Sequence, residues 1–167
     1  RIESWLGSDT AIIRCMPNTP ALIGKGVSGM IANANTSESQ KALASDLMAA
    51  VGITVWVETE QAIDAVTAVS GSGPAYYFLF LEAMQEAAEA MGLPADTARI
   101  LCLQTAIGAC ELVNSSGGSV SELRRKVTSP GGTTEQAILQ FESGGLRELV
   151  RIALRAACDR SKQLAKS

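Results

Sequence analysis

The segment from about Ala95 to Val113 constrains the fold of this chain more than any other, because it is apolar on nearly every side. Its spacing predicts a helix, and only Arg99, Gln104 and Glu111 are strongly polar in its middle. A helix of that kind must be buried all round. A helical domain of about a hundred residues offers little volume to enclose it. We therefore expect a second copy of the chain to cover part of this helix.

The residues before about Glu60 have a strand-type pattern with one helix. Apolar, β-branched runs predict three strands, at 10–16, 27–31 and 53–57. A possible capping box of Ser37 and Gln40 opens a helix between the last two strands, which Gly52 is placed to stop. That order predicts parallel pairing through a right-handed crossover. Such a unit needs more strands, so residues 1–59 are expected to be the last part of an incomplete α/β domain.

From Glu60 onward the pattern is helical throughout. One apolar stripe at helical spacing, which ends before Gly92 and Pro94, consists of Tyr77, Leu81, Met84, Ala88 and Met91. Beyond the apolar segment, further helices are expected at about 120–127, after Thr133 and at 146–165. The sequence therefore predicts a mainly α protein, in which an all-helical domain over residues 60–167 follows the α/β part.

Composition narrows the class of protein. The net charge of −3 and the pI of about 5.0 give no basic surface for nucleic acid or for an anionic membrane. No apolar run is long enough to span a bilayer. The four cysteines show no CxxC spacing and lie in apolar runs, as core residues do in a reducing compartment. We expect a soluble cytoplasmic protein, with an amino-terminal segment missing before Arg1.

The chain contains no histidine, which excludes Ser-His-Asp and Cys-His triads and every metal site that needs a histidine ligand. Any chemistry must use carboxylates, hydroxyls, lysine, backbone amides or a bound cofactor. No metal ion is expected.

Three glycine-rich segments are candidate binding loops. Gly24–Gly29 matches GxGxxG, but a strand rather than a helix follows it, so it is not expected to bind a dinucleotide. Ser70–Pro74 (SGSGP) interrupts two helical stretches. It is either a close backbone approach to a ligand, with Ser72 as a donor, or a packing corner before a helix that starts at Pro74.

The run Ser129–Gln136 (SPGGTTEQ) is the most informative of these loops. Its two glycines permit a concave arrangement of backbone amides, and a helix follows directly. Thr133 with Gln136 fits a capping box. Free amides at the positive end of a helix favour a carboxylate or phosphate, so we expect anion binding here rather than a simple helix cap.

Taken together, three segments resemble the pyrroline-5-carboxylate reductase family: RCMPNTPALIGKG at 14–26, DAVTAVSGSGPAYYF at 64–78 and LRRKVTSPGGTTEQAI at 123–138. FESGG at 141–145, Leu146-Arg147 and Asp159-Arg160-Ser161 fit the same pattern. The order and spacing agree from about Thr10 to the end.

The resemblance implies an enzyme that reduces Δ1-pyrroline-5-carboxylate to L-proline with NADPH or NADH, the last step of proline biosynthesis. It implies that residues 1–59 end an NAD(P)-binding Rossmann domain. Residues 60–167 would form a helical dimerisation and substrate-binding domain like that of 6-phosphogluconate dehydrogenase-like enzymes. The domain would interlock with that of a second subunit, and the dimers can form rings. The active site would then lie between one subunit's nucleotide domain and its partner's helical domain.

The resemblance also implies roles for single residues. Those near the nicotinamide end of the cofactor would be Met16, Pro17, Asn18 and Thr19. Those that hold the substrate would be Ser129, Gly131, Gly132, Thr133 and Thr134, with Glu60 and Ser72 as further contributors. Thr134 would offer its hydroxyl to the ring nitrogen. An imine nitrogen takes a proton from water near neutral pH, so the absence of histidine is compatible with this reaction.

Two alternatives stay open. The isolated chain could be an inactive helical dimerisation module, because it lacks a pyrophosphate-binding loop. A related hydroxyacid or imine reductase would instead use a catalytic lysine, for which Lys126 beside Arg124 and Arg125 is the nearest candidate.

Overall fold

The structure, a computed structural model, describes residues 5–166 and divides into two compact units. One unit contains the described residues up to Tyr76 together with those from Ile152 onward, and the other is Tyr77–Arg151. Helices dominate both, with one small sheet in the first, so the mainly α expectation is confirmed. The domain boundary expected at Glu60 stays a prediction, because the two compact units divide the chain at other residues.

The first unit is built on a three-stranded sheet in the order β1-β2-β3. The strands are β1 (Ile13–Met16), β2 (Gly26–Ala32) and β3 (Gly52–Trp56), and a short 3-10 helix η1 (Thr19–Ile23) lies between the first two. β1 is antiparallel to β2, and β2 is parallel to β3. The parallel pairing expected across the helix α2 (Glu38–Ala49) is confirmed. The GxGxxG match leads into a strand, as expected, and this strand begins within the match at Gly26.

Helix α2 begins as the sequence predicts and ends earlier than expected. The Ser37 hydroxyl accepts the Gln40 amide, and the Gln40 side chain accepts the Ser37 amide, which confirms the capping box. The helix stops at Ala49, and Gly52 is the first residue of β3 rather than the helix terminator. Gly52 has a φ of 153° and its α-carbon lies so close to Gly26 that a side chain would collide with that residue's backbone.

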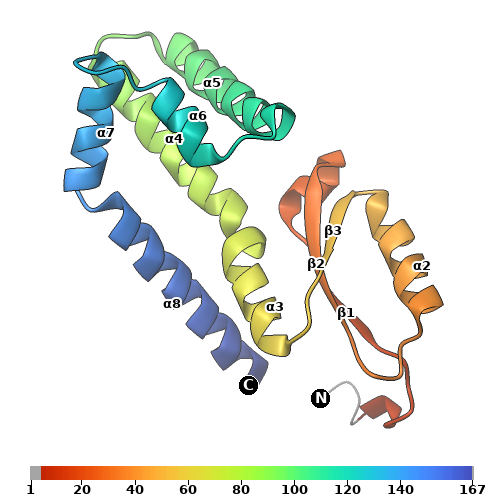
Figure 1. The fold of residues 1–167 in the computed structure, drawn as a ribbon. Helices are drawn as coiled ribbons and strands as arrows, with labels where there is room; N and C mark the ends of the chain where they lie inside the picture. The colour runs from red at the N-terminus through yellow and green to blue at the C-terminus, as the bar shows by residue number, and fades with distance from the viewer. Residues whose placement is uncertain (1–4, 167) are drawn as a thin grey trace. The chain divides into compact units, whose positions relative to one another are not determined.

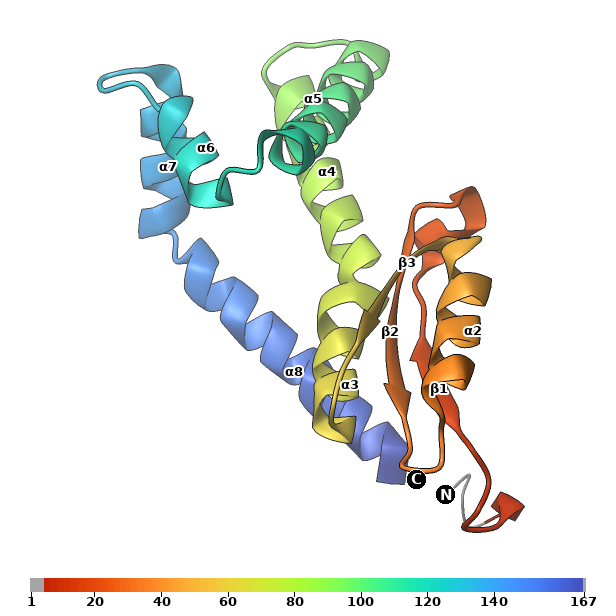
Figure 2. The same ribbon diagram turned by 45° about the vertical axis from the view of Figure 1, so that its right-hand side comes forward.

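Helices cover both faces of the sheet in this unit. The indole N–H of Trp56 donates to the Ser45 hydroxyl of α2 at 3.0 Å. On the other face, a side chain at Gly29 would collide with Val66 of α3 (Glu60–Val66), so this glycine lets the helix approach the strand. Figures 1 and 2 show α2 and α3 on opposite sides of the strands.

The chain passes from α3 into a π-helix, η2 (Thr67–Gly71), and then into α4 (Gly73–Ala90). The interruption expected at SGSGP is therefore real, but its form is a widened helical turn instead of a break. The remaining helices are α5 (Ala95–Ser116), α6 (Val120–Lys126), α7 (Thr133–Ser143) and α8 (Leu146–Lys166). Gly92 at a φ of 97° and Pro94 as the N-cap of α5 separate α4 from α5 as the sequence predicts.

Helix α5 is mostly uncovered in a single copy. Only Ala98 and Cys102 are buried along it, whereas Ile100 is 58% and Leu101 51% exposed. The sequence requires this helix to be covered, and packing within one chain does not supply the cover. No helix within residues 5–166 has the length and apolar character to cross a membrane.

Candidate functional site

The loop after β1 is held in place by the side chain of Asn18. Its Oδ1 accepts the backbone N–H of Val27 at 3.0 Å, and its Nδ2 donates to the carbonyl of Ser70 at 3.2 Å. The first bond joins the loop to β2, and the second joins it to η2. Asn18, expected beside the cofactor, thus uses both ends of its amide within the chain.

The neighbouring residues of this loop are arranged differently. Pro17 and Thr19 are exposed, and Thr19 opens the 3-10 helix η1. The side chain of Met16 lies against Gly71, where an added Cβ would be 2.6 Å from its terminal methyl. Gly71 is therefore small because Met16 occupies the adjacent space. The structure brings two of the predicted segments together, the loop at 16–19 and the SGSG segment.

Ser72 lies directly after η2. Its backbone N–H donates to the carbonyl of Thr67 at 2.8 Å, the i→i+5 bond that closes a π turn. Its hydroxyl is half-buried and has no hydrogen-bond partner among the described residues. That free hydroxyl is available to a ligand.

Glu60 lies at the first position of α3 and forms an ion pair with Arg14 of β1. Both side chains are substantially exposed. Glu60 also lies next to the N-cap Thr59, whose hydroxyl accepts the Ala62 amide at 3.2 Å. The pair connects the sheet to the start of the helix that leads into η2.

The SPGGTT loop, in the other unit, differs in detail from the sequence expectation. Thr133 is the first residue of α7 and not its cap, because Gly132 occupies the N-cap position without a side-chain bond. The capping box of Thr133 and Gln136 was therefore wrong. The carboxylate of Glu135 instead accepts the N–H of Gly131 at 2.7 Å and fixes the turn, which Gly131 enters at a φ of 73°.

Some backbone amides of this loop donate hydrogen bonds within the chain, and others have no acceptor. Gly131 donates to Glu135 and Gly132 donates to the Ser129 carbonyl at 3.0 Å. The amides of Thr133 and Thr134 lie in the first turn of α7, where no intrahelical acceptor exists. No acceptor among residues 5–166 is bonded to them, or to the two threonine hydroxyls. The expected anion-binding amides are thus those of the threonines rather than of the glycines.

An ion pair supports the turn between α7 and α8. Arg147 donates from Nε and Nη2 to both carboxylate oxygens of Glu142, at 2.7 to 3.0 Å. The hydrogen bonds from Arg147 hold the pKa of Glu142 below its usual value, and those from Glu142 raise the pKa of Arg147. Both residues fall in the FESGGLR segment that the resemblance includes.

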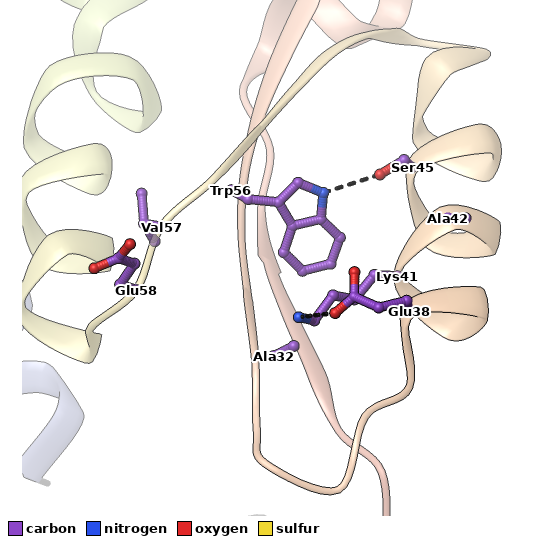
Figure 3. Close-up of a pocket in the computed structure, with 8 residues that line it drawn as sticks. All are labelled: Ala32, Glu38, Lys41, Ala42, Ser45, Trp56, Val57 and Glu58. Carbon is purple, nitrogen blue, oxygen red and sulfur yellow. Dashed lines mark hydrogen bonds and ion pairs between the residues drawn. The ribbon is translucent and has the colours of Figure 1, made fainter.

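An open cavity of about 650 Å³ lies between α2 and the end of β3. Figure 3 shows Trp56 in it, beside the Glu38–Lys41 ion pair of α2. The cavity adjoins Ala32, which pairs with Ile13, whereas the predicted cofactor loop begins at Met16 at the other end of β1. None of the predicted site residues lines it.

The structure also bears on two further hypotheses, a catalytic lysine at Lys126 and a metal site. Lys126 is exposed at the end of α6, next to Arg124 and Arg125, as a solvated basic turn would be. Within the described residues, no group of three or more cysteine, aspartate or glutamate side chains could hold a metal ion.

The sequence reasoning missed Tyr76, whose hydroxyl donates to the carbonyl of Ala68 in η2 at 3.0 Å. It also missed the hydroxyls of Thr67 and Ser70, which bond to carbonyls one turn earlier in the helix. The nearest signal was the closely spaced hydroxyl residues before SGSGP, since such side chains satisfy carbonyls where a helix widens.

Comparisons with known proteins agree on one family. The pattern described as pyrroline-5-carboxylate reductase dimerisation matches residues 60–164. The chain is 54% identical over 164 residues to the pyrroline-5-carboxylate reductase of Pseudomonas aeruginosa, and 44% identical over 165 residues to that of Haemophilus influenzae. These alignments cover 98% of this chain and 60% and 61% of the relatives. The chain thus spans about 60% of the length of the curated relatives that it matches.

Solved structures give the same result. A pyrroline-5-carboxylate reductase from Coxiella burnetii superposes with a TM-score of 0.95 at 52% identity, over 98% of this chain and 60% of that one. The pyrroline carboxylate reductase of Plasmodium falciparum, solved with NADP bound, gives a TM-score of 0.90 at 35% identity, over 97% and 65% of the two chains.

Proposed function

Because this chain belongs to the pyrroline-5-carboxylate reductase family, we propose that the whole protein reduces Δ1-pyrroline-5-carboxylate to L-proline with NAD(P)H. The observation that supports this most directly is the set of unpaired donors at the start of α7. There, two amides and two hydroxyls of adjacent threonines have no partner among the described residues. A small anionic substrate with a polar ring atom needs such a set of donors.

The substrate carboxylate binds at the amides of Thr133 and Thr134. Unpaired N–H groups at a helix start point toward an anion, and the helix dipole adds to the attraction. Gly131 and Gly132 form the turn that presents them, and Glu135 fixes this turn through the Gly131 amide. Ser129 lies at the start of this loop. Its carbonyl accepts the Gly132 N–H, and its side chain is exposed.

Thr134 orients the substrate ring through its hydroxyl. A carboxylate fixed at the backbone amides leaves the ring nitrogen within reach of a neighbouring side chain. The hydroxyls of Thr133 and Thr134 are both free there, and the family resemblance assigns this contact to Thr134. When bound, NAD(P)H supplies the hydride for the C=N carbon. The chain contributes position and electrostatics, which are the main protein contributions in cofactor enzymes.

The loop at 16–19 fits the nicotinamide end of the cofactor. One side of the loop is open to a flat ring, because Pro17 and Thr19 are exposed and Met16 is half-buried. Asn18 holds the loop to β2 and η2 through its Oδ1 and one N–H of its Nδ2. Glu60 and Ser72 complete the polar surroundings, Ser72 through its free hydroxyl.

The protein acts as a homodimer through its helical domain, and such dimers associate further into a ring. The exposed apolar residues of α5 support the first part of this proposal. Each active site combines the nucleotide domain of one subunit with the helical domain of the other. The expected location is the cytoplasm, and no metal takes part.

An assay of the whole protein with NADPH and Δ1-pyrroline-5-carboxylate tests the function. We expect cofactor oxidation with an equal yield of L-proline, and much slower reduction of 1-pyrroline, the same ring without the carboxylate. The 167-residue chain alone should be inactive, since it has no pyrophosphate-binding loop. Failure of the whole protein to form proline, or equal rates with both imines, would contradict the proposal.

A further inference from the structure

The π-helix η2 depends on side chains for its hydrogen bonds. Two hydroxyls of η2 donate to backbone carbonyls of the preceding helix α3, Thr67 to Ile63 at 2.9 Å and Ser70 to Val66 at 3.0 Å. The hydroxyl of Tyr76 donates to the carbonyl of Ala68 within η2 at 3.0 Å. Ala68 is 2% exposed, so water cannot readily replace the tyrosine hydroxyl. π turns of this kind are rare and occur often at functional sites.

Two contacts connect this π-helix to the loop at 16–19. The Ser70 carbonyl accepts the Nδ2 of Asn18, and Gly71 lies against the side chain of Met16. Both contacts depend on where the widened turn places residues 70 and 71. A relaxation of η2 toward a regular α-helix would move both residues, because each helical residue is rotated by about 100°. The position of the loop is thus tied to the shape of η2.

Tyr76 is the only one of the three hydroxyl donors that lies outside η2 itself. It stands on the first turns of α4 and reaches back across the π turn to Ala68. Its bond therefore spans the turn, whereas the bonds of Thr67 and Ser70 stay local.

We propose that Tyr76 is a positioning residue for hydride transfer, which it serves by holding η2 and, through η2, Met16 and Asn18 of the cofactor loop. The proposal rests on the reductase function proposed above. The hydroxyl of Tyr76 is bonded to Ala68 of η2, so its loss is expected to change the geometry of η2 rather than to remove a substrate contact. The carboxylate site on α7 stays intact.

The test compares Tyr76→Phe with Tyr77→Phe in the whole protein. Each change removes one hydroxyl and keeps the ring. Tyr77 is 71% exposed, and its hydroxyl has no partner in the part of the chain that the structure describes. Tyr76→Phe should lower kcat about tenfold and change KM for pyrroline-5-carboxylate by less than about twofold, since misplacement slows the step without removing a substrate contact. Tyr77→Phe should match the wild type.

A second variant and a second readout keep the proposal testable. Asn18→Asp removes the donor to Ser70 and keeps the acceptor for Val27, and it should lower kcat in the same way. Amide hydrogen exchange at Ser72, whose N–H closes the π turn, should be faster in Tyr76→Phe than in Tyr77→Phe.

The outcomes separate the two proposals. A wild-type protein that makes no proline contradicts the function, while exchange at Ser72 still reports on the role of Tyr76 in η2. With an active wild type, an unchanged kcat in Tyr76→Phe overturns the positioning role. An equal loss in Tyr77→Phe, or a loss confined to KM for pyrroline-5-carboxylate, overturns it as well.

Discussion

Thr134 is the residue to which the proposed chemistry assigns the most specific task. Its hydroxyl has no partner within the described chain and it does not cap α7, so its removal should leave folding nearly unchanged. In the whole protein, we expect Thr134→Ala to lower kcat/KM by about ten- to a hundredfold, which corresponds to about 1–3 kcal/mol for one hydrogen bond in the transition state.

Thr134→Ser is the matched control, because it keeps the hydroxyl and loses only a methyl group. Steady-state kinetics should show much of the activity retained. Full activity in Thr134→Ala, or equal damage in Thr134→Ser, would mean that the loop shapes the pocket without touching the ring nitrogen.

Single residues also show where sequence reasoning reached its limit. Anion binding by SPGGTT could be predicted from residue types alone, because glycines before a helix start expose amides, and it stays a prediction. The sequence alone could not predict which amides are free, since the side chains of Glu135 and Gln136 both lie within reach of the turn. In the structure Glu135 bonds to Gly131, and Thr133 becomes part of the helix.

At the scale of elements, a partly buried hydrogen bond connects the end of α8 to α3. The Ser161 hydroxyl donates to the carboxylate of Asp64 at 2.7 Å, and Asp64 is 9% exposed. Ser161→Ala should lower the free energy of unfolding by about 1–3 kcal/mol, because it leaves a buried carboxylate oxygen without its donor. Urea denaturation of the 167-residue chain measures this.

Ser161→Thr retains the hydroxyl and serves as the control, with stability expected close to that of the wild type. If Ser161→Ala and Ser161→Thr shift the urea midpoint equally, the hydrogen bond does not hold α8 against α3. Apolar contacts of α8 would then hold it there.

Local patterns predicted the elements better than they predicted the joints between them. The capping box of α2 and the strand–helix–strand unit follow from neighbouring residues, and both are confirmed. The π-helix η2 does not, because its carbonyl at Ser70 is satisfied by Asn18, 52 residues earlier in the chain. A widened turn that depends on so distant a partner leaves no periodic signal.

At the scale of the whole molecule, the central expectation is a homodimer. Much of the surface of α5 is apolar and uncovered in one copy, with Ile100, Leu101 and Leu112 each more than half exposed. Sedimentation at micromolar concentration should show a stable dimer. Leu101→Asp should weaken or abolish it, because a charge in an apolar interface costs several kcal/mol.

Ser39→Asp adds the same charge on the exposed first turn of α2, which belongs to the other compact unit than α5, and it should leave the dimer intact. A wild-type chain that sediments as a monomer would contradict the expectation. So would a Leu101→Asp dimer of unchanged affinity.

Above all, we propose that the whole protein transfers a hydride from a nicotinamide cofactor to a carboxylate-bearing cyclic imine. The most direct measurement uses NADPH with both hydrogens at the nicotinamide C4 replaced by deuterium, together with the whole protein and Δ1-pyrroline-5-carboxylate. Mass spectrometry and NMR of the product should show L-proline with one deuterium, located at C5, while the nitrogen takes its proton from water. Proline without deuterium at C5, or no proline at all, would contradict the claim.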